Sequence, residues 1–134
     1  MKGVARKAKP KAKVRRKSAV QGLTRAQFKK IALAFPAAEE GTSFGHPSIL
    51  VAKKFFTRFR PEDNSLVLHV GSTDERDMLI EAEPALFHIT GHYRNYPAVL
   101  ARLEKLDAAT LKGMLERRWR QLCPKKLQKD YQNG

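Results

Sequence analysis

The sequence predicts an α+β fold in which an antiparallel sheet of about five strands carries helices over one face. Three segments place apolar residues at helical spacing, and five short apolar runs lie among them in the order α-β-β-β-α-β-β-α. The links between the first three runs are short, which favours antiparallel pairing. Because this order leaves no room for repeated parallel crossovers, we expect the helices to pack on a single antiparallel sheet.

The first helix is predicted to begin after Thr24, because Thr24 and Gln27 have the spacing of a capping box. Pro36 is expected to end it, since proline cannot continue a helix. Apolar residues recur at helical spacing between these two signals and predict one buried stripe, which consists of Phe28, Ile31, Ala32 and Phe35.

A connector is predicted over residues 37–47, where two glycines permit tight backbone paths. Alternation of side chains in the strand after the next turn predicts that Phe55, Thr57 and Phe59 share one face of the sheet. The strands expected in this part of the chain cover residues 48–52, 55–60 and 65–70, with turns at Lys53-Lys54 and at residues 61–64.

A second helix is predicted to run to about residue 82, because Ser72 and Glu75 repeat the capping-box spacing. Its apolar edge is narrow and consists of Met78, Leu79 and Ala82. Two more strands are then expected, over residues 87–90 and 98–103.

The last helix is predicted to begin after Asp107, whose side chain can cap it, and to end before Pro124. Gly113 weakens this helix by about 1 kcal/mol relative to alanine, which is too little to cancel the burial of its apolar side chains. That stripe consists of Leu111, Met114, Leu115, Trp119 and Leu122.

The charge of the chain is concentrated at its N-terminal end. The 134 residues include 27 Lys and Arg and 13 Asp and Glu, and nine of the basic residues lie within residues 1–17, where there is no acid. We therefore predict a basic tail over residues 1–22, disordered when free, and one α+β domain over residues 23–134. The candidate phosphate-binding residues of the tail are Lys2, Arg6, Lys7, Lys9, Lys11, Lys13, Arg15, Arg16 and Lys17.

Such a tail is attracted to polyanions, of which we expect nucleic acid first and an anionic membrane surface second. DNA is the nucleic acid that we expect, and RNA is the alternative. An alternative is a solubilising extension that binds nothing in particular. The single cysteine, Cys123, excludes an intramolecular disulfide and cannot alone ligate a structural zinc. We expect no metal, no cofactor and no membrane span, and we predict a cytoplasmic monomer that can associate with the nucleoid.

The segment between the last two predicted strands packs six polar, aromatic and proline residues together. Arg94 can pair bidentately with a phosphate, and His92 can add a hydrogen-bond donor. Tyr93 or Tyr96 can stack on an unpaired base. The alternative is structural: Tyr96 packs at the sheet edge, and Arg94 pairs with an acid such as Glu39 or Glu40.

No catalytic motif is found, and we predict that the protein is not an enzyme. His88 and His92 are four residues apart, but a strand setting removes the helical face that would bring both onto one metal. His46 lies near two serines without the strained elbow or the triad context of a nucleophile. We keep His46 as a possible binding residue on its own loop.

Several blocks of the sequence resemble the MmcQ/YjbR family. They are Gly45-His46-Pro47-Ser48, the hairpin over residues 54–68, the run His92-Tyr93-Arg94-Asn95-Tyr96-Pro97, and the C-terminal stretch that ends Cys123-Pro124-Lys125-Lys126-Leu127. The resemblance covers about residues 24–128. It implies a compact bacterial α+β domain, similar in shape to the frataxin-like fold and usually labelled DNA-binding. The lysine-rich tail departs from the usual family pattern.

Together these patterns predict a small nucleic-acid-associated protein that binds the phosphate backbone without sequence preference. The tail is expected to supply most of the binding, and the loop over residues 92–97 is expected to contribute. The alternative is a module that binds a protein or a small molecule through the loops around His46 and Arg94, with no nucleic-acid role for the domain.

Overall fold

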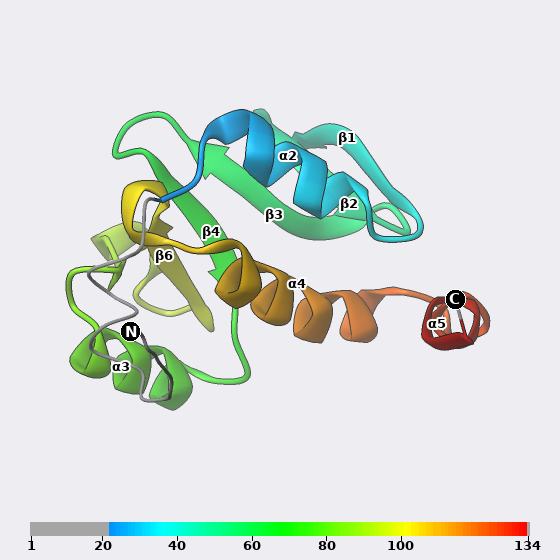
Figure 1. Ribbon diagram of the computed structural model, residues 1–134. Coiled ribbons are helices and arrows are strands. Elements are labelled where there is room, and N and C mark those ends of the chain that lie inside the picture. Colours follow the sequence, from blue (N-terminus) through cyan, green and yellow to red (C-terminus); the bar gives the residue numbers. More distant parts are fainter. Residues whose placement is uncertain (1–21, 134) are drawn as a thin grey trace, which may run out of the picture.

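The computed structural model describes residues 22–133, so the basic residues of positions 1–17 lie outside the described part of the chain. A six-stranded sheet runs in the order β1-β2-β3-β4-β6-β5, and every pair of neighbouring strands is antiparallel (Figure 1). The predicted α+β class is therefore confirmed. The elements are α2 (Arg25–Leu33), β1 (Ala38–Ser43), β2 (His46–Val51), β3 (Lys54–Arg60), β4 (Ser65–His69), α3 (Thr73–Ala82), β5 (Phe87–His88), the 3-10 turn η1 (Gly91–Tyr93), β6 (Ala98–Arg102), the 3-10 turn η2 (Leu103–Lys105), α4 (Ala108–Leu122) and α5 (Lys125–Asn133).

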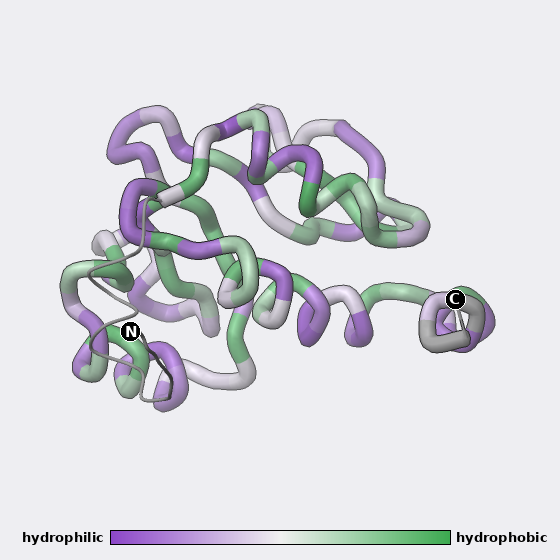
Figure 2. The backbone as a smooth tube through the Cα atoms, viewed as in Figure 1, coloured by the Kyte–Doolittle hydropathy of each residue, from purple (hydrophilic) through white to green (hydrophobic). Residues whose placement is uncertain are grey.

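The main core lies between the sheet and its helices. The capping box of α2 is present, because the Thr24 hydroxyl accepts from the Gln27 amide at 3.1 Å and the Gln27 side chain accepts from the Thr24 amide at 2.9 Å. Figure 2 shows hydrophobic and hydrophilic residues alternating along α3 and α4, as expected for helices with one buried face. The buried helical residues of this core include Phe28, Ala32, Leu111, Leu115 and Trp119.

Trp119 joins three parts of this core. Its indole nitrogen donates to the carbonyl oxygen of Pro36 at 2.8 Å. The ring centroid lies 4.7 Å from that of Tyr131 on α5 and 5.9 Å from that of Phe35 after α2. The predicted stripe of the last helix is thus present, with Trp119 fully buried.

Two elements were not predicted. Residues 38–43 form the edge strand β1 rather than part of a connector, and they pair with β2 from Ala38 opposite Val51 to Ser43 opposite His46. Exposed residues on this edge strand hid the alternation that marks a strand.

The second element that was not predicted is α5. It begins directly after Pro124, whose carbonyl accepts from the amides of Leu127 and Gln128. Proline ends one helix and suits the first turn of the next.

A β-bulge in β3 changes which side chains share a face. Leu50 of β2 lies opposite Phe55 and its neighbour Ile49 lies opposite Thr57, so β3 has one extra residue between them. Phe55 consequently packs with a second, smaller cluster, whereas Phe59 packs against the main core. The prediction that these two rings share a face is wrong, because one extra residue turns the side chains over.

The second cluster lies on the face of the sheet opposite the main core. Its buried members are Val67, Ala98 and Leu100, with Phe55 and Tyr93 packed against them. Their neighbours along β4 and β6 belong to the main core, and successive side chains of a strand point to opposite faces. This face carries the candidate site described below.

Helix α3 also differs from its prediction. The Ser72 hydroxyl accepts from the Glu75 amide, but the Glu75 carboxylate accepts from the Gly71 amide and pairs with Arg117 instead of completing a capping box. Met78 is 67% exposed and Ala82 is also exposed, so neither belongs to the predicted apolar edge. The residues of α3 that pack against the core are Leu79 and Ile80.

Smaller differences concern the ends of strands. The turn between β2 and β3 is Ala52-Lys53, one residue earlier than predicted, and both residues have positive φ. Strand β5 has only two residues, because its pairing with β6 stops at His88. Within residues 22–133, no helix combines the length and the apolar character that crossing a bilayer requires.

Candidate functional site

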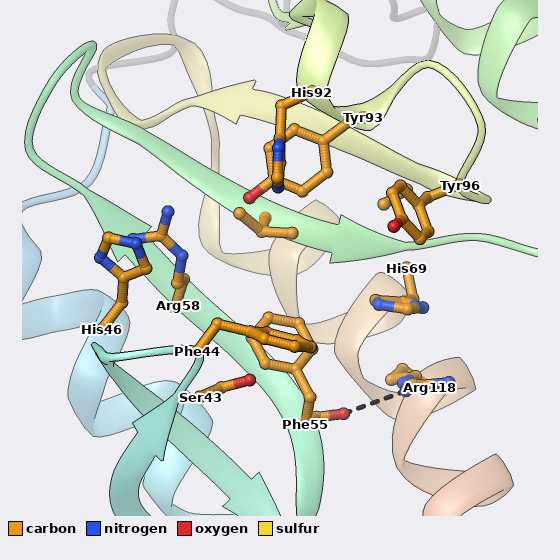
Figure 3. A pocket seen from close by; sticks show the side chains of 12 residues that line it. Ser43, Phe44, His46, Phe55, Arg58, His69, His92, Tyr93, Tyr96 and Arg118 are labelled. Carbon is orange, nitrogen blue, oxygen red and sulfur yellow. Dashed lines mark hydrogen bonds between the residues drawn. The ribbon is translucent and has the colours of Figure 1, made fainter.

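A pocket of about 480 Å³ lies on the face of the second cluster (Figure 3). Segments that are far apart in the sequence form its walls: the β1–β2 hairpin, the central strands, the segment after β5 and one residue of α4. The lining residues are Ser43, Phe44, His46, Phe55, Arg58, Val67, His69, His92, Tyr93, Tyr96, Ala98 and Arg118.

The hairpin between β1 and β2 turns on two residues, Phe44 and Gly45. Their φ angles are 52° and 80°, and positive φ at both central positions is the requirement of a type I′ turn. Asn-Gly is the usual sequence for such a turn, because a bulky residue at positive φ is strained. Here the first position carries a phenylalanine that is 99% exposed, so an aromatic ring stands at the mouth of the pocket at some conformational cost.

The loop over residues 91–96, which contains η1, is held by a buried arginine of α3. Nη1 of Arg76 donates to the carbonyl oxygens of Arg94 at 2.8 Å, Tyr96 at 3.2 Å and Tyr93 at 3.3 Å. A single planar cation thus contacts three carbonyl groups of the loop. Two of them also accept from the backbone: the Tyr93 carbonyl from the Tyr96 amide and the Tyr96 carbonyl from the Ala98 amide. The loop's shape therefore depends on α3.

Aromatic rings surround the pocket on several sides. The His92 ring lies 4.8 Å from the Tyr93 ring in an edge-on arrangement and 6.4 Å from the Tyr96 ring. The Phe55 ring lies 5.5 Å from that of His69. Tyr96 is 54% exposed, so this ring, like that of Phe44, presents apolar surface to solvent. These contacts make the wall of the pocket a set of aromatic surfaces.

The charged side chains that line the pocket are two arginines. The buried Arg58 has one hydrogen bond, from Nη1 to the Phe59 carbonyl at 3.4 Å. Arg118 donates to the Phe55 carbonyl at 3.0 Å and to the Gln121 side chain at 3.2 Å. No Asp or Glu lines the pocket. Neither guanidinium has a carboxylate partner among the described residues, whereas Arg60, Arg76, Arg117 and Arg120 each pair with one.

Burial lowers the pKa of two basic side chains in the pocket, Arg118 and His69. The Nε atom of Arg118 is buried without a hydrogen-bond partner, and burial lowers the pKa of this guanidinium. Burial also lowers the pKa of His69 to about 4, with a further contribution from the charge of Arg118. His69 is therefore neutral at pH 7, while the two arginines keep the pocket positive. A backbone hydrogen bond lowers the pKa of the exposed Glu62, and the charges of Arg60 and Arg58 add to this, although Glu62 does not line the pocket. Two cations that form no ion pair inside the pocket favour the binding of an anion there.

Four of the loop residues singled out from the sequence meet at this pocket: His46, His92, Tyr93 and Tyr96. Arg94 does not line it and is exposed. The alternative in which Arg94 pairs with Glu39 or Glu40 is not what the structure shows. Glu39 pairs with Lys53 at 2.9 Å, and Glu40 pairs with Lys29 at 3.2 Å.

Sequence reasoning missed several residues of the site. Phe55 and Arg118 reach the pocket only through the bulge and through packing of α4, and neither leaves a local signal in the sequence. Arg76 did leave one. It stands one turn before Leu79 and Ile80, which marks the inward face of α3.

A Ser-His-Asp cluster lies outside the pocket. The Ser65 hydroxyl is 3.0 Å from Nε2 of His88, and a carboxylate oxygen of Asp63 is 3.8 Å from the same nitrogen. A catalytic triad needs serine and carboxylate on opposite ring nitrogens and an accessible hydroxyl, whereas Ser65 is fully buried. Over residues 22–133, no three His, Cys, Asp or Glu side chains gather as a metal site would require.

Comparison with known proteins gives a family match. A family model described as YjbR matches residues 33–121. Three curated relatives, all uncharacterized proteins, come from Mycobacterium bovis and from two strains of Mycobacterium tuberculosis; each is 30% identical over 67 residues. The match covers 50% of this chain and 52% of each relative, so the chain spans about half their length. No solved structure matches the chain.

Proposed function

This chain belongs to the YjbR family, and from that premise we propose that it is a small nucleic-acid-associated protein. DNA is the first partner of this proposal and RNA the second, bound without sequence preference in the cytoplasm or at the nucleoid. The domain contacts the nucleic acid through the pocket and the loop over residues 91–96. The basic tail adds attraction to phosphates.

One observation supports nucleic-acid binding by the domain. The pocket combines exposed aromatic rings with two guanidinium groups that lack carboxylate partners among the described residues. Guanidinium groups bind phosphate oxygens, and aromatic rings stack on bases whatever their identity. The absence of an acid from the pocket lining keeps the potential attractive to a polyanion.

The tail's part in this proposal rests on the sequence. Nine basic side chains within residues 1–17 can each neutralise a phosphate, and such contacts need no folded structure. This contribution is independent of the pocket, so the two can be separated by experiment.

A second candidate function is the binding of a small molecule by the domain. The observation in its favour is the volume of the pocket, about 480 Å³, which falls within the roughly 300–1,000 Å³ typical of ligand sites. In both candidates the domain binds and does not catalyse.

A mobility-shift experiment tests the proposal. Duplex DNA, single-stranded DNA and RNA are compared, each with the full chain and with a chain that lacks residues 1–20. We expect the full chain to bind all three and the shortened chain to keep weaker binding at low salt. Arg58→Gln should reduce that residual binding, since it removes one charge of the pocket. If the shortened chain binds none of the three at low salt, the domain has no nucleic-acid role and the small-molecule candidate stands.

A further inference from the structure

We propose that the pocket takes one unpaired nucleotide of a single strand, with the base against the rings of Phe44 and Tyr96 and the flanking phosphates on Arg58 and Arg118. This inference rests on the proposed function and makes it more specific. It predicts a preference for single strands over duplex that originates in the domain rather than in the tail.

The two guanidinium groups lie toward different ends of the pocket. In Figure 3, Arg58 lies beside His46, while Arg118 lies beside His69, with the rings of Phe44 and Phe55 between them. Arg118 donates to the carbonyl of Phe55, whereas Arg58 stands three residues further along β3, beyond the bulge. Two cations toward different ends of a pocket suit a ligand that carries more than one anionic group. A nucleic-acid strand is such a ligand, because it carries a phosphate on each side of every nucleotide.

The exposed ring of Phe44 supplies a stacking surface at the mouth of the pocket. A residue that is fully exposed and held at positive φ contributes neither to the core nor to the turn, for which Asn would be the better choice. Strained positions of this kind are enriched at binding sites. Tyr96 offers a second exposed ring from the loop that Arg76 holds in place.

The floor of the pocket explains why the base must be unpaired. Val67 and Ala98 form an apolar floor between the aromatic walls, which suits the flat face of a base. In a duplex both faces of each base are covered by stacking and its pairing edge is occupied, so a paired base cannot enter. Apolar and aromatic contacts do not distinguish one base from another, which agrees with binding that lacks sequence preference.

The test uses the full chain and measures three ligands by fluorescence anisotropy and competition. They are a labelled single strand of about ten nucleotides, a duplex of the same length, and free adenosine monophosphate as competitor. Added salt screens the tail, which is identical in every variant. Amide signals of Phe44, Val67 and Ala98 in NMR spectra report whether the pocket itself is occupied.

We expect the single strand to bind more tightly than the duplex and to shift those three amide signals. Phe44→Asn removes the ring while suiting the turn better, and it should weaken single-strand binding about tenfold or more with duplex binding unchanged. Arg58→Gln should weaken single-strand binding by a similar factor. Lys53→Asn is the matched control: Lys53 also has positive φ, in the next hairpin, but lies outside the pocket, so single-strand binding should not change.

Three outcomes would overturn the inference, and they are distinguishable. Equal affinity for strand and duplex, with no effect of Phe44→Asn, would leave nucleic-acid binding by the tail and the loop over residues 91–96 but would remove the pocket from it. Adenosine monophosphate that binds as tightly as the strand would show that the ligand is a free nucleotide and that the second cation is not used. No binding of any nucleic acid would overturn the proposed function as well.

Discussion

Nη1 of Arg76 lies 2.8 Å from the carbonyl oxygen of Arg94, so a buried cation on α3 holds the backbone of a residue eighteen positions further along the chain. The contact is to the backbone and not to the side chain of Arg94. The contact that holds the loop over residues 91–96 therefore does not use the Arg94 side chain, which is exposed.

Arg76→Met should loosen this loop. The substitution removes the charged donor from three carbonyl groups, but those of Tyr93 and Tyr96 still accept from backbone amides. The main loss is therefore the bond to the Arg94 carbonyl, and a hydrogen bond to a charged group contributes about 1.5–3 kcal/mol. We expect the free energy of unfolding to fall by about 2–3 kcal/mol, as measured by urea denaturation. Amides of Tyr93 and Tyr96 should also exchange hydrogen faster than in the unmodified protein.

Arg94→Ala is the control for that experiment. It removes the side chain but keeps the carbonyl that Arg76 contacts, so stability should stay within about 0.5 kcal/mol of the original. If Arg94→Ala destabilises the protein as much as Arg76→Met, the loop is held by the Arg94 side chain and our account of Arg76 is wrong.

Trp119→Ala should be the most damaging of these substitutions to the fold. It creates a cavity under α4 and leaves the Pro36 carbonyl without its donor, with an expected cost of about 3–5 kcal/mol. Trp119→Phe keeps most of the apolar volume and should cost distinctly less. Denaturation midpoints provide the comparison, and an unchanged midpoint for Trp119→Ala would contradict the packing described above.

Phe44→Asn should stabilise the fold even though it is expected to weaken binding. Asn adopts positive φ at lower cost than Phe, and relief of this strain is worth on the order of 1 kcal/mol. The melting temperature by calorimetry gives the result. Lys53→Asn should stabilise by a similar amount, because it relieves the same strain and loses only an exposed ion pair with Glu39. A fall in melting temperature for Phe44→Asn would show that the exposed ring supports the fold.

Stability should fall as the pH drops from about 6.5 toward 4, in part through His69. Burial lowers the pKa of folded His69 to about 4, so in this window the unfolded chain binds a proton that the folded chain does not. Above the window the ring is neutral in both states and has no effect. The loss is at most about 3 kcal/mol, and solvent near this partly exposed ring reduces it.

His69→Gln isolates this contribution. The difference in unfolding free energy between the variant and the original protein should grow in favour of the variant as the pH falls through the window. Burial also lowers the pKa of His88, so His69→Gln should keep part of the loss of stability at low pH. The double variant His69→Gln/His88→Gln should lose less stability at low pH than His69→Gln alone. A pH-independent difference would mean that His69 takes up its proton at the same pH in the folded and unfolded chains, so that burial does not lower its pKa.

The tail can be tested by the salt dependence of DNA binding. If residues 1–17 neutralise phosphates, the logarithm of affinity should fall with the logarithm of salt concentration at about −0.9 per phosphate contacted. Removal of residues 1–20 should then flatten the slope by several units. Equal slopes for the two chains would assign the binding to the domain alone.

The elements that the sequence predicted best are those with local signals. The capping box at Thr24 and the apolar stripe of α4 are both present, because each depends on residues within a few turns of one another. Strand β1 lacks such a signal. Its exposed glutamates pair with lysines of other elements, so its pattern resembles a loop until its partner β2 is known.

The candidate site shows the same limit. The sequence singled out His46, His92, Tyr93 and Tyr96 as residues of two separate loops, and nothing in the sequence indicated that the loops face one pocket. That meeting depends on sheet order, which places β1 and β2 beside β3 and the loop before β6 beside β4. Arg94 looked like the best phosphate ligand by residue type, yet the pocket's positive charge comes from Arg58 and Arg118, which were not singled out.

Because β3 contains a bulge, the pocket depends on the number of residues in this strand. With Phe56 opposite no residue of β2, Phe55 faces the pocket while Phe56 and Phe59 face the main core. Deletion of one residue here would restore strict alternation and would force either Phe55 into the core or Arg58 out of the pocket. A substitution in β3 changes one side chain and can leave the pocket intact. A change in the length of β3 moves several side chains to the other face of the sheet and cannot leave the pocket intact. We expect relatives that share this pocket to show no insertions or deletions between the residues equivalent to Lys54 and Arg60.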